Sequence, residues 1–253
     1  MHHAVKLPDL LRAWRATAGK ESQSGKPLPQ KEVAQRMAVS ERWYRSLESD
    51  AGVPLTPEVL NRLATALTLG TDERLALFGH VYVNGGHGSV PAPKEQDAAQ
   101  VALARWFTAQ EHLATYRVDH AWNVVGHSET MATWFPWVLE PGANLLRWAL
   151  TTPAAREQLA DWPMHAAAYL SQLRFSLATT PHHEQLSTLL DELLEDPECR
   201  ALWEREPRVL AYRQGHVFKL RLPHVSDEDI IVTSQILLPA YQPEIRHVLL
   251  LPL

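Results

Sequence analysis

The sequence predicts an all-α first domain of five short helices, followed by an α+β second domain with one antiparallel sheet. Residues 1–83 contain successive amphipathic helical patterns, whereas segment 84–97 is dense in Gly and Pro and has no periodicity. Beyond it, helical patterns are flanked by alternating, β-branched stretches. We therefore expect a first domain at 1–83, a linker at 84–97 and a second domain at 98–253.

Capping residues and apolar spacing place the helices of the first domain. Ser40 and Thr56 suit the position that precedes a helix, and Pro29 suits a first turn. Apolar side chains then recur at the i, i+3, i+4, i+7 spacing of one helix face. The expected helices are, in order, Lys6–Ala18, Pro29–Met37, Ser40 to about Leu47, and two that open at Thr56-Pro57-Glu58 and Thr71-Asp72-Glu73.

The second domain combines a helical middle with strands on both sides. A helix is expected at Ala99–Gln110, and two early strands, Ala114–Val118 and Ala121–Val125, are joined by a tight turn at Asp119-His120. A proline-punctuated helical section follows. The late strands are expected at Val209–Arg213, Val217–Leu222, Ile230–Leu238 and Arg246–Leu251. Early and late strands around a helical middle predict one antiparallel sheet.

Charge is distributed unevenly between the two predicted domains. The net charge is −5, but the first fifty residues carry nine Lys or Arg against six Asp or Glu, while residues 84–253 carry thirteen against twenty. A mildly basic N-terminal segment followed by an acidic remainder of the chain is typical of a DNA-binding protein with a separate second domain. The single cysteine, Cys199, and the absence of an apolar run long enough for a bilayer lead us to expect a cytoplasmic protein without a membrane segment.

The stretch from Gln30 to Leu47 fits two short helices that cross at a steep angle. Such a crossing needs a small residue at the contact and a tight turn between the helices, which Ala34 and Ala38-Val39 can provide. The inner faces would carry Val33 and Met37 on the first helix and Tyr44 and Leu47 on the second. This arrangement predicts a helix-turn-helix.

The outward side of the second helix would then face the DNA major groove. Its residues are Ser40, Glu41, Arg42, Trp43, Arg45 and Ser46. Arg42 and Arg45 are the candidates for contacts to base edges, and either could instead bind a phosphate. A plain helical hairpin with no role in DNA binding is the alternative interpretation.

These residues resemble the helix-turn-helix of the xenobiotic-response-element class, the phage-repressor type. The likeness extends to Glu48 and to Gln30, which in that class braces the helix start against a DNA phosphate. The class usually has Gly in the turn where this chain has Ala38. Because Ala tolerates a positive φ at a cost of about 1 kcal/mol, we expect the turn to form with slight strain.

Longer segments are similar to the actinobacterial MmyB-like regulators. Ser40 to Glu48 follows their Ser-x-x-Tyr-Tyr-x-x-Leu-Glu form, with Trp43 for the first Tyr and with Arg45-Ser46 where those proteins have Arg just before Leu. Later matches are Val118–Val124, Asn144–Leu150, Pro153–Arg156, Trp162 and Pro197–Trp203. The resemblance implies a PAS-like second domain with an internal apolar pocket that receives small lipophilic effectors.

Aromatic side chains gather where such a pocket would lie. Seven of the nine tryptophans fall between Trp106 and Trp203. An effector such as a bound fatty acid is expected, with Arg147 or Arg174 as partners for an acidic head group; the rings could equally fill a core without a cavity. The candidate ligand-binding residues are Trp122, Trp134, Phe135, Trp137, Leu145, Leu146, Trp148 and Arg147.

No residue pattern indicates catalysis or a resident cofactor or metal. His182-His183-Glu184 is the densest histidine group, but adjacent histidines on a helix diverge by about 100° and do not easily share one ion. We therefore expect no enzyme. The first hypothesis is a homodimeric regulator of a double-stranded DNA operator that senses a small apolar ligand. The second is a regulator whose second domain only dimerises or binds a protein partner.

Overall fold

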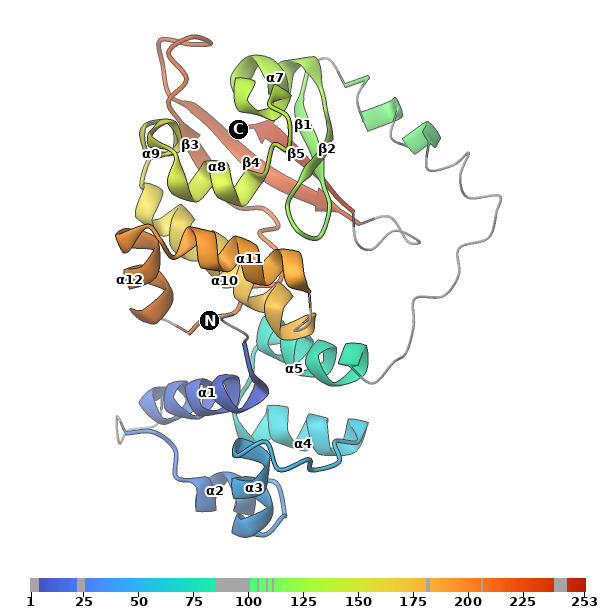
Figure 1. Cartoon of the computed structure of the whole chain (residues 1–253), viewed down its shortest axis with the longest axis vertical. Helices are drawn as coiled ribbons and strands as arrows, with labels where there is room; N and C mark the ends of the chain where they lie inside the picture. Colours follow the sequence, from blue (N-terminus) through green and yellow to red (C-terminus); the bar gives the residue numbers. More distant parts are fainter. Residues whose placement is uncertain are drawn as a thin grey trace. The chain divides into compact units, whose positions relative to one another are not determined.

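The computed structural model describes residues 5–21, 26–84, 101–103, 105–107, 109–110, 112–180, 183–205, 207–238 and 245–253 (Figure 1). The expected linker at 84–97 lies outside the described residues, apart from Asn84. The chain forms two compact units, each assembled from discontinuous segments. The first draws on Met1–Gly88, Ser171–Asp191 and Trp203–Ala211, and the second on Ser89–Leu170, Glu192–Leu202 and Tyr212–Leu253.

The first unit begins with the helices that the sequence predicts. They are α1 (Leu7–Glu21), α2 (Gln30–Arg36), α3 (Glu41–Glu48), α4 (Pro57–Ala66) and α5 (Thr71–Asn84). Ser40 caps α3, because its hydroxyl accepts a hydrogen bond from the Trp43 amide at 3.1 Å, and Thr56 caps α4 in the same manner. Capping residues therefore located these helix starts correctly.

The turn between α2 and α3 has the conformation expected for it. Ala38 has a φ of 54°, in the left-handed region that favours Gly. The turn is closed by two backbone hydrogen bonds of 3.0 Å, from the Ala38 amide to the Gln35 carbonyl and from the Val39 amide to the Ala34 carbonyl. The predicted inner residues Val33, Ala34, Met37, Tyr44 and Leu47 are all buried.

Parts of three later helices also belong to the first unit. They are the end of α10 (Trp162–Thr179), most of α11 (Glu184–Leu193) and the last turn of α12 (Pro197–Arg205). The Nδ1 atom of His80 on α5 lies 2.7 Å from the carbonyl oxygen of Ala178 on α10. Helix α10 thus supplies residues up to Leu170 to the second unit and residues from Ser171 to the first.

The second unit contains a five-stranded sheet in the order β2-β1-β5-β4-β3, with all pairs antiparallel. Its strands are β1 (Ala114–Val118), β2 (Val124–His127), β3 (Val217–Leu220), β4 (Ile230–Leu237) and β5 (Arg246–Pro252). This confirms the antiparallel sheet. One face is buried and includes Tyr116, Phe218, Leu220, Val232, Val248 and Leu250.

Helices cover the buried face of this sheet. They include α7 (Glu129–Trp134), the 3-10 turn η1 (Pro136–Leu139), α8 (Leu145–Thr151) and the start of α10. Helices α9 (Pro153–Gln158) and α12 (Pro197–Arg205) complete the fold, and α9 leads from α8 toward α10 (Figure 1). Within the described ranges, no helix has the length and apolar character required to cross a membrane.

One expected strand is wrong in part, and another is not a strand. Ala121 and Trp122 belong to a turn, because the Asp119 carboxylate accepts the amides of Ala121 and Asn123 at 2.9 Å and Trp122 has a φ of 63°. Strand β2 therefore begins only at Val124. Segment Val209–Arg213 is not a strand. It packs against α10, where the Leu210 amide donates to the Ser171 carbonyl at 3.2 Å.

Candidate functional site

The six residues predicted to face DNA lie together on α3 and at its start. Ser40, Arg42 and Arg45 are exposed, and Glu41, Trp43 and Ser46 are partly exposed. Arg45 forms an i, i+4 ion pair with Glu41 along the exposed side of the helix. An exposed pair of this kind contributes about 0.5 kcal/mol or less, so it leaves Arg45 available to exchange partners.

Gln30 occupies a different environment from these six residues. Its amide donates a 2.7 Å hydrogen bond to the carboxylate of Glu48, the last residue of α3. The same carboxylate accepts from the Nε atom of Arg15 on α1 at 2.8 Å, although Glu48 is only 4% exposed. Arg15 also donates to the Leu28 carbonyl at 2.8 Å. This cluster of Arg15, Gln30 and Glu48 ties α1 and the start of α2 to the end of α3.

The electrostatics of the cluster stabilise its buried charge. Burial acts to raise the pKa of Glu48, but hydrogen bonds from Arg15 and Gln30 outweigh it and hold the pKa below its usual range. Burial raises the pKa of Tyr44. Glu48 is therefore charged and Tyr44 neutral near neutral pH, and both stabilise the frame that presents the exposed side of α3.

The second unit contains an internal apolar cavity of about 20 Å³ between its helices and the buried face of the sheet. That is room for roughly one water molecule, against roughly 300–1,000 Å³ in typical ligand sites. The structure therefore holds the cavity almost closed. It is lined by Tyr116, Met131, Phe135, Trp137, Leu145, Trp148, Leu159, Tyr169, Phe218, Leu220 and Leu250.

Four of the eight predicted ligand residues line this cavity, namely Phe135, Trp137, Leu145 and Trp148. The other four do not. Leu146 is fully buried elsewhere in the core, and Trp122 is buried with the Arg246 guanidinium 4.3 Å above its ring. Trp134 is half-buried, and Arg147 is exposed and forms a 2.7 Å ion pair with Glu192.

Neither expected partner for an acidic head group lies at the cavity. Arg147 lies outside it, and Arg174, which is buried, donates to the backbone carbonyls of Trp203 at 2.6 Å and Arg208 at 3.0 Å. The Arg174 guanidinium also lies 3.8 Å from the centre of the Trp203 ring. These contacts give Arg174 a structural role within the first unit.

A larger groove of about 600 Å³ lies outside the closed cavity in the same unit. It is lined mainly by the η1–α8 region, including Asn144, Arg147 and Thr151. Trp137 and Trp148 line both the groove and the cavity, and their rings are stacked with centroids 4.9 Å apart at an angle of 12°. This tryptophan pair therefore separates the groove from the cavity.

A buried arginine lies beyond two of the cavity's rings. Arg213 is 5% exposed, and its guanidinium carbon lies 4.6 Å from the ring centre of Tyr169 and 4.7 Å from that of Phe218, both of which line the cavity. One of its terminal nitrogens lies 2.9 Å from Nδ1 of His165 and also contacts Nε2 of His216. The sequence analysis missed these three polar residues, since they are distant in the chain and form no motif.

Both histidines are neutral in this environment. Burial, followed by the nearby charge of Arg213, lowers the pKa of His165 to about 4, and the same two causes lower the pKa of His216 to about 4. Neutral imidazole nitrogens can accept hydrogen bonds from the guanidinium without cancelling its charge. The polar group behind the cavity is therefore cationic.

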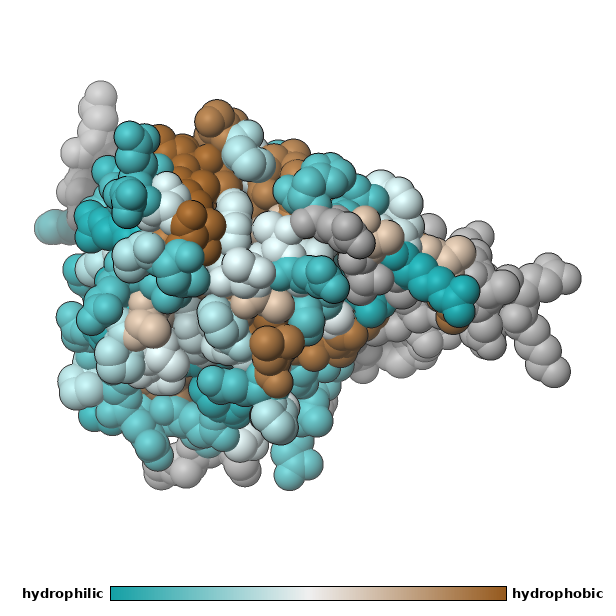
Figure 2. All heavy atoms as spheres, turned by 90° about the horizontal axis from the view of Figure 1, so that it is seen from above, coloured by the Kyte–Doolittle hydropathy of each residue, from teal (hydrophilic) through white to brown (hydrophobic). Residues whose placement is uncertain are grey.

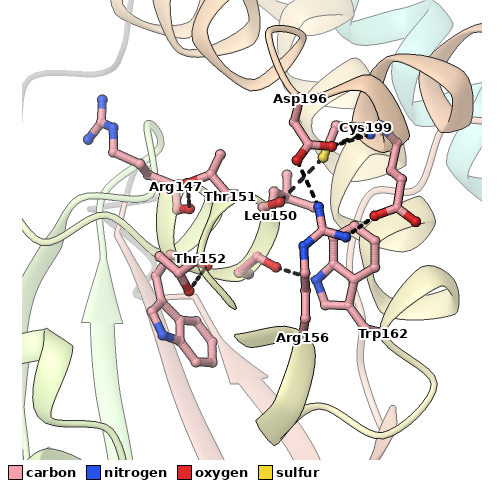
Figure 3. A network of polar contacts seen from close by, with 11 residues as sticks. Arg147, Leu150, Thr151, Thr152, Arg156, Trp162, Asp196 and Cys199 are labelled. Atoms are coloured by element: carbon pink, nitrogen blue, oxygen red, sulfur yellow. Dashed lines mark hydrogen bonds and ion pairs between the residues drawn. The ribbon is translucent and has the colours of Figure 1, made fainter. Parts of the chain in front are cut away.

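A separate polar network joins α9 to α12 (Figure 3). The Arg156 guanidinium lies 3.8 Å from the centre of the Trp162 ring and forms ion pairs with Asp196, at 2.8 Å, and with Glu198. Cys199 is buried here, and burial raises the pKa of its thiol to about 12. In the figure the Arg147 side chain points away from this network. These contacts indicate a structural role.

The described residues contain no group of three His, Cys, Asp or Glu side chains that could hold a metal ion. Of the histidine group noted in the sequence, His182 lies outside the described residues. A search among curated proteins finds no match to this chain. The family model described as the MmyB-like transcription regulator ligand binding domain matches residues 99–251, more than half of the chain. The match contains the cavity, the groove and Arg213, and the chain belongs to this family of transcription regulator ligand-binding domains.

Proposed function

We propose that this protein is a transcription regulator that binds an operator in double-stranded DNA through α3 and responds to a small apolar effector, such as a fatty-acyl compound. The observation that carries the DNA-binding part is the arrangement of α2 and α3. Their facing sides are buried around Ala34, while the opposite side of α3 presents Arg42 and Arg45. This arrangement supports a helix-turn-helix in which α3 would be the recognition helix of a phage-repressor-like domain.

Arg42 and Arg45 would supply the contacts to DNA. Arg42 forms no ion pair within the described part of the chain, and the exposed Arg45–Glu41 pair is weak. An Arg that binds guanine O6 and N7 discriminates against a wrong base by roughly 1–3 kcal/mol. Because one short helix reads only a few base pairs, the regulator would bind a two-fold operator as a homodimer.

The role of Gln30 follows from its bond to Glu48. Its amide nitrogen donates one hydrogen bond to Glu48 at 2.7 Å and has a second N–H besides. A phosphate accepts hydrogen bonds, so this second N–H suits a phosphate contact. We therefore propose that Gln30 positions α2 against α3 and also contacts a DNA phosphate.

The effector would enter the aromatic cavity of the second unit. The cavity of about 20 Å³ is too small for a fatty-acyl chain, so binding must separate some of its rings. Trp137 and Trp148 are the candidates for this movement, because they are the two residues that line both the cavity and the adjacent groove. A ligand that binds only the opened conformation shifts the protein toward that conformation.

Helix α10 offers a path from the effector to the DNA-binding helices. Tyr169 lines the cavity near the middle of the helix, and Ala178 near its end contacts His80 on α5. A displacement of Tyr169 can thus be transmitted along one continuous helix. Such a regulator would act in the cytoplasm without catalysing a reaction.

A second candidate function is that the second unit dimerises or binds a protein partner without a small ligand. It is favoured by apolar side chains on the outer face of the sheet, where Val217, Ile231 and Leu237 are each nearly half exposed. Hydrophobic residues, brown in Figure 2, gather at the surface between hydrophilic ones. Exposed apolar patches mark interaction sites in many proteins.

Two measurements test the proposal. Selection from random double-stranded DNA with the full chain should enrich one sequence with two-fold symmetry, and failure to enrich any sequence would refute operator binding. Mass spectrometry of the purified protein, first native and then denaturing, should release a lipophilic small molecule. A protein that never carries or takes up such a molecule would favour the second candidate function.

A further inference from the structure

The outward side of α3 carries one large apolar side chain, Trp43, among polar neighbours. Trp43 is partly exposed to solvent, whereas Tyr44 and Leu47 of the same helix are buried. The Trp43 ring takes part in no hydrogen bond, aromatic pair or cation–π contact within the described part of the chain. The folded protein therefore leaves an apolar surface available on the helix that is proposed to bind DNA.

Local contacts fix the position of Trp43 in the first turn of α3. Its amide donates a 3.1 Å hydrogen bond to the hydroxyl of Ser40, the residue that caps the helix. Tyr44, the next residue, has no exposed surface and anchors the helix in the core. In helix-turn-helix proteins the N-terminal residues of the recognition helix contact base edges. Trp43 thus belongs to the end of α3 that would lie closest to the bases.

The exposed side of α3 has two chemically different flanks. Successive residues of an α-helix are about 100° apart, which places Arg42 nearly opposite the buried Tyr44. The ion pair of Glu41 with Arg45 lies on one flank of Arg42. Trp43 lies on the other flank, about 100° around the helix from Arg42. A DNA duplex that receives α3 would therefore meet charge on one side of Arg42 and an apolar ring on the other.

The chemistry of the base edges determines what such a ring can contact favourably. In the major groove each base pair presents hydrogen-bonding groups, and thymine adds an apolar group, its C5-methyl. An indole placed on a polar base edge would displace water and return at most one hydrogen bond, because its ring has a single donor. An indole placed on a methyl group removes apolar surface of both partners from water. The thymine methyl is therefore the base feature that matches Trp43.

We propose that Trp43 determines operator specificity at one base pair of each half-site by contacting the C5-methyl group of its thymine. This inference rests on the proposed function, in which α3 enters the major groove of an operator. Arg42 and Arg45 supply charge and hydrogen bonds, and Trp43 supplies the apolar contact. Because the methyl group marks the thymine side of the pair in the major groove, Trp43 distinguishes T·A from A·T as well as from both G·C orientations.

The test removes the methyl group without changing base pairing. Each thymine of the selected operator is replaced in turn by deoxyuridine, and affinity for the full chain is measured by fluorescence anisotropy at one salt concentration. One replacement in each half-site should weaken binding by about fourfold, the effect of one buried methyl group. In Trp43→Ala the same replacement should have no effect. Leu75→Ala is the matched control, because Leu75 is an apolar side chain of α5 that is 45% exposed, and it should keep both the affinity and the fourfold loss.

The deoxyuridine comparison separates base reading from structural support. If Trp43 only supported the helix, Trp43→Ala would bind both DNAs more weakly by one common factor and keep the fourfold loss, which would overturn the proposal. The unchanged protein provides a test that needs no variant: no loss at any thymine, or half-sites without thymine, would also overturn it. If selection enriches no operator, DNA binding itself fails together with this inference. An enriched operator that is insensitive to deoxyuridine refutes only the role of Trp43.

Discussion

The carboxylate of Glu48 lies 2.8 Å from the Nε atom of Arg15, and the carboxylate is buried while the Arg15 side chain is 18% exposed. This ion pair joins α1 to α3 through two residues that are 33 positions apart in the chain, and the Gln30 amide donates to the same carboxylate. The DNA-binding surface proposed for α3 is therefore held from behind by a buried charge. The same surface is exposed where it would meet DNA.

Glu48→Gln should destabilise the protein by about 3 kcal/mol, since it weakens the charge-assisted hydrogen bonds that Arg15 and Gln30 donate to a buried carboxylate. Urea unfolding followed by circular dichroism measures the effect. Asp9→Asn is the control, because the Asp9–Arg12 ion pair is exposed and its loss should cost no more than about 0.5 kcal/mol. Equal effects of the two substitutions would show that burial of the Glu48 pair does not matter.

Arg42→Ala and Arg45→Ala should each weaken binding to the selected operator by about 1–3 kcal/mol without unfolding the protein. The loss arises because each exposed guanidinium would contact a base edge or a phosphate. Fluorescence anisotropy with labelled operator DNA gives the affinity, and circular dichroism checks the fold. Arg147→Ala, an exposed arginine of the second unit, should leave the affinity unchanged. If both α3 variants bind as tightly as the original protein, the recognition helix is assigned wrongly.

Stability should fall as the pH is lowered from about 6.5 to about 4. Burial lowers the pKa values of His165 and His216 to about 4 in the folded state, against 6.5 for a free histidine. Between these values the unfolded chain binds more protons than the folded chain, so acid favours unfolding and stability rises with pH. Urea unfolding at pH 7 and pH 5 tests this, and His165→Gln should reduce the difference. A protein that is equally stable at both pH values would refute the assignment of neutral histidines.

Trp137→Ala should destabilise the protein by about 3–5 kcal/mol and speed the uptake of apolar molecules into the cavity. Trp137 is 9% exposed and separates the cavity from the groove through its stack with Trp148. Stopped-flow fluorescence of an apolar dye gives the uptake rate. Trp137→Phe retains an aromatic ring and loses the buried indole nitrogen, which has no hydrogen-bond partner among the described residues. This variant should take up the dye at nearly the original rate. If neither variant takes up the dye faster than the original protein, the entrance to the cavity lies elsewhere.

Local chemistry explains what could be predicted from the sequence. Ser40 and Thr56 cap helices through contacts with amides three residues ahead, and the turn at Ala38 depends on its immediate neighbours. Strand Ala114–Val118 was also placed correctly, since its burial and composition agree. The start of β2 was placed too early, because the Asp119 side chain accepts hydrogen bonds from two backbone amides and extends the turn through Trp122.

The polar end of the candidate ligand site depends on contacts between distant residues. His165 and Arg213 are 48 residues apart, and they meet only after α10 has packed beside the sheet. Arg213 ends the segment Val209–Arg213, which the sequence pattern predicts to be a strand. Nothing in that pattern predicts that the Arg213 side chain is buried. Arg147 was the more obvious candidate because it lies among aromatic residues, yet Glu192 holds it at the surface.

The discontinuous first unit has a consequence for the order in which the chain folds. Its five N-terminal helices leave the ribosome first, but the unit also contains Ser171–Asp191 and Trp203–Ala211. The contact between His80 and Ala178 must wait until the ribosome has added about one hundred further residues. The N-terminal helices thus complete their compact unit only after much of the family-matched region at residues 99–251 has been synthesised, while strands β3, β4 and β5 of the second unit are still to follow.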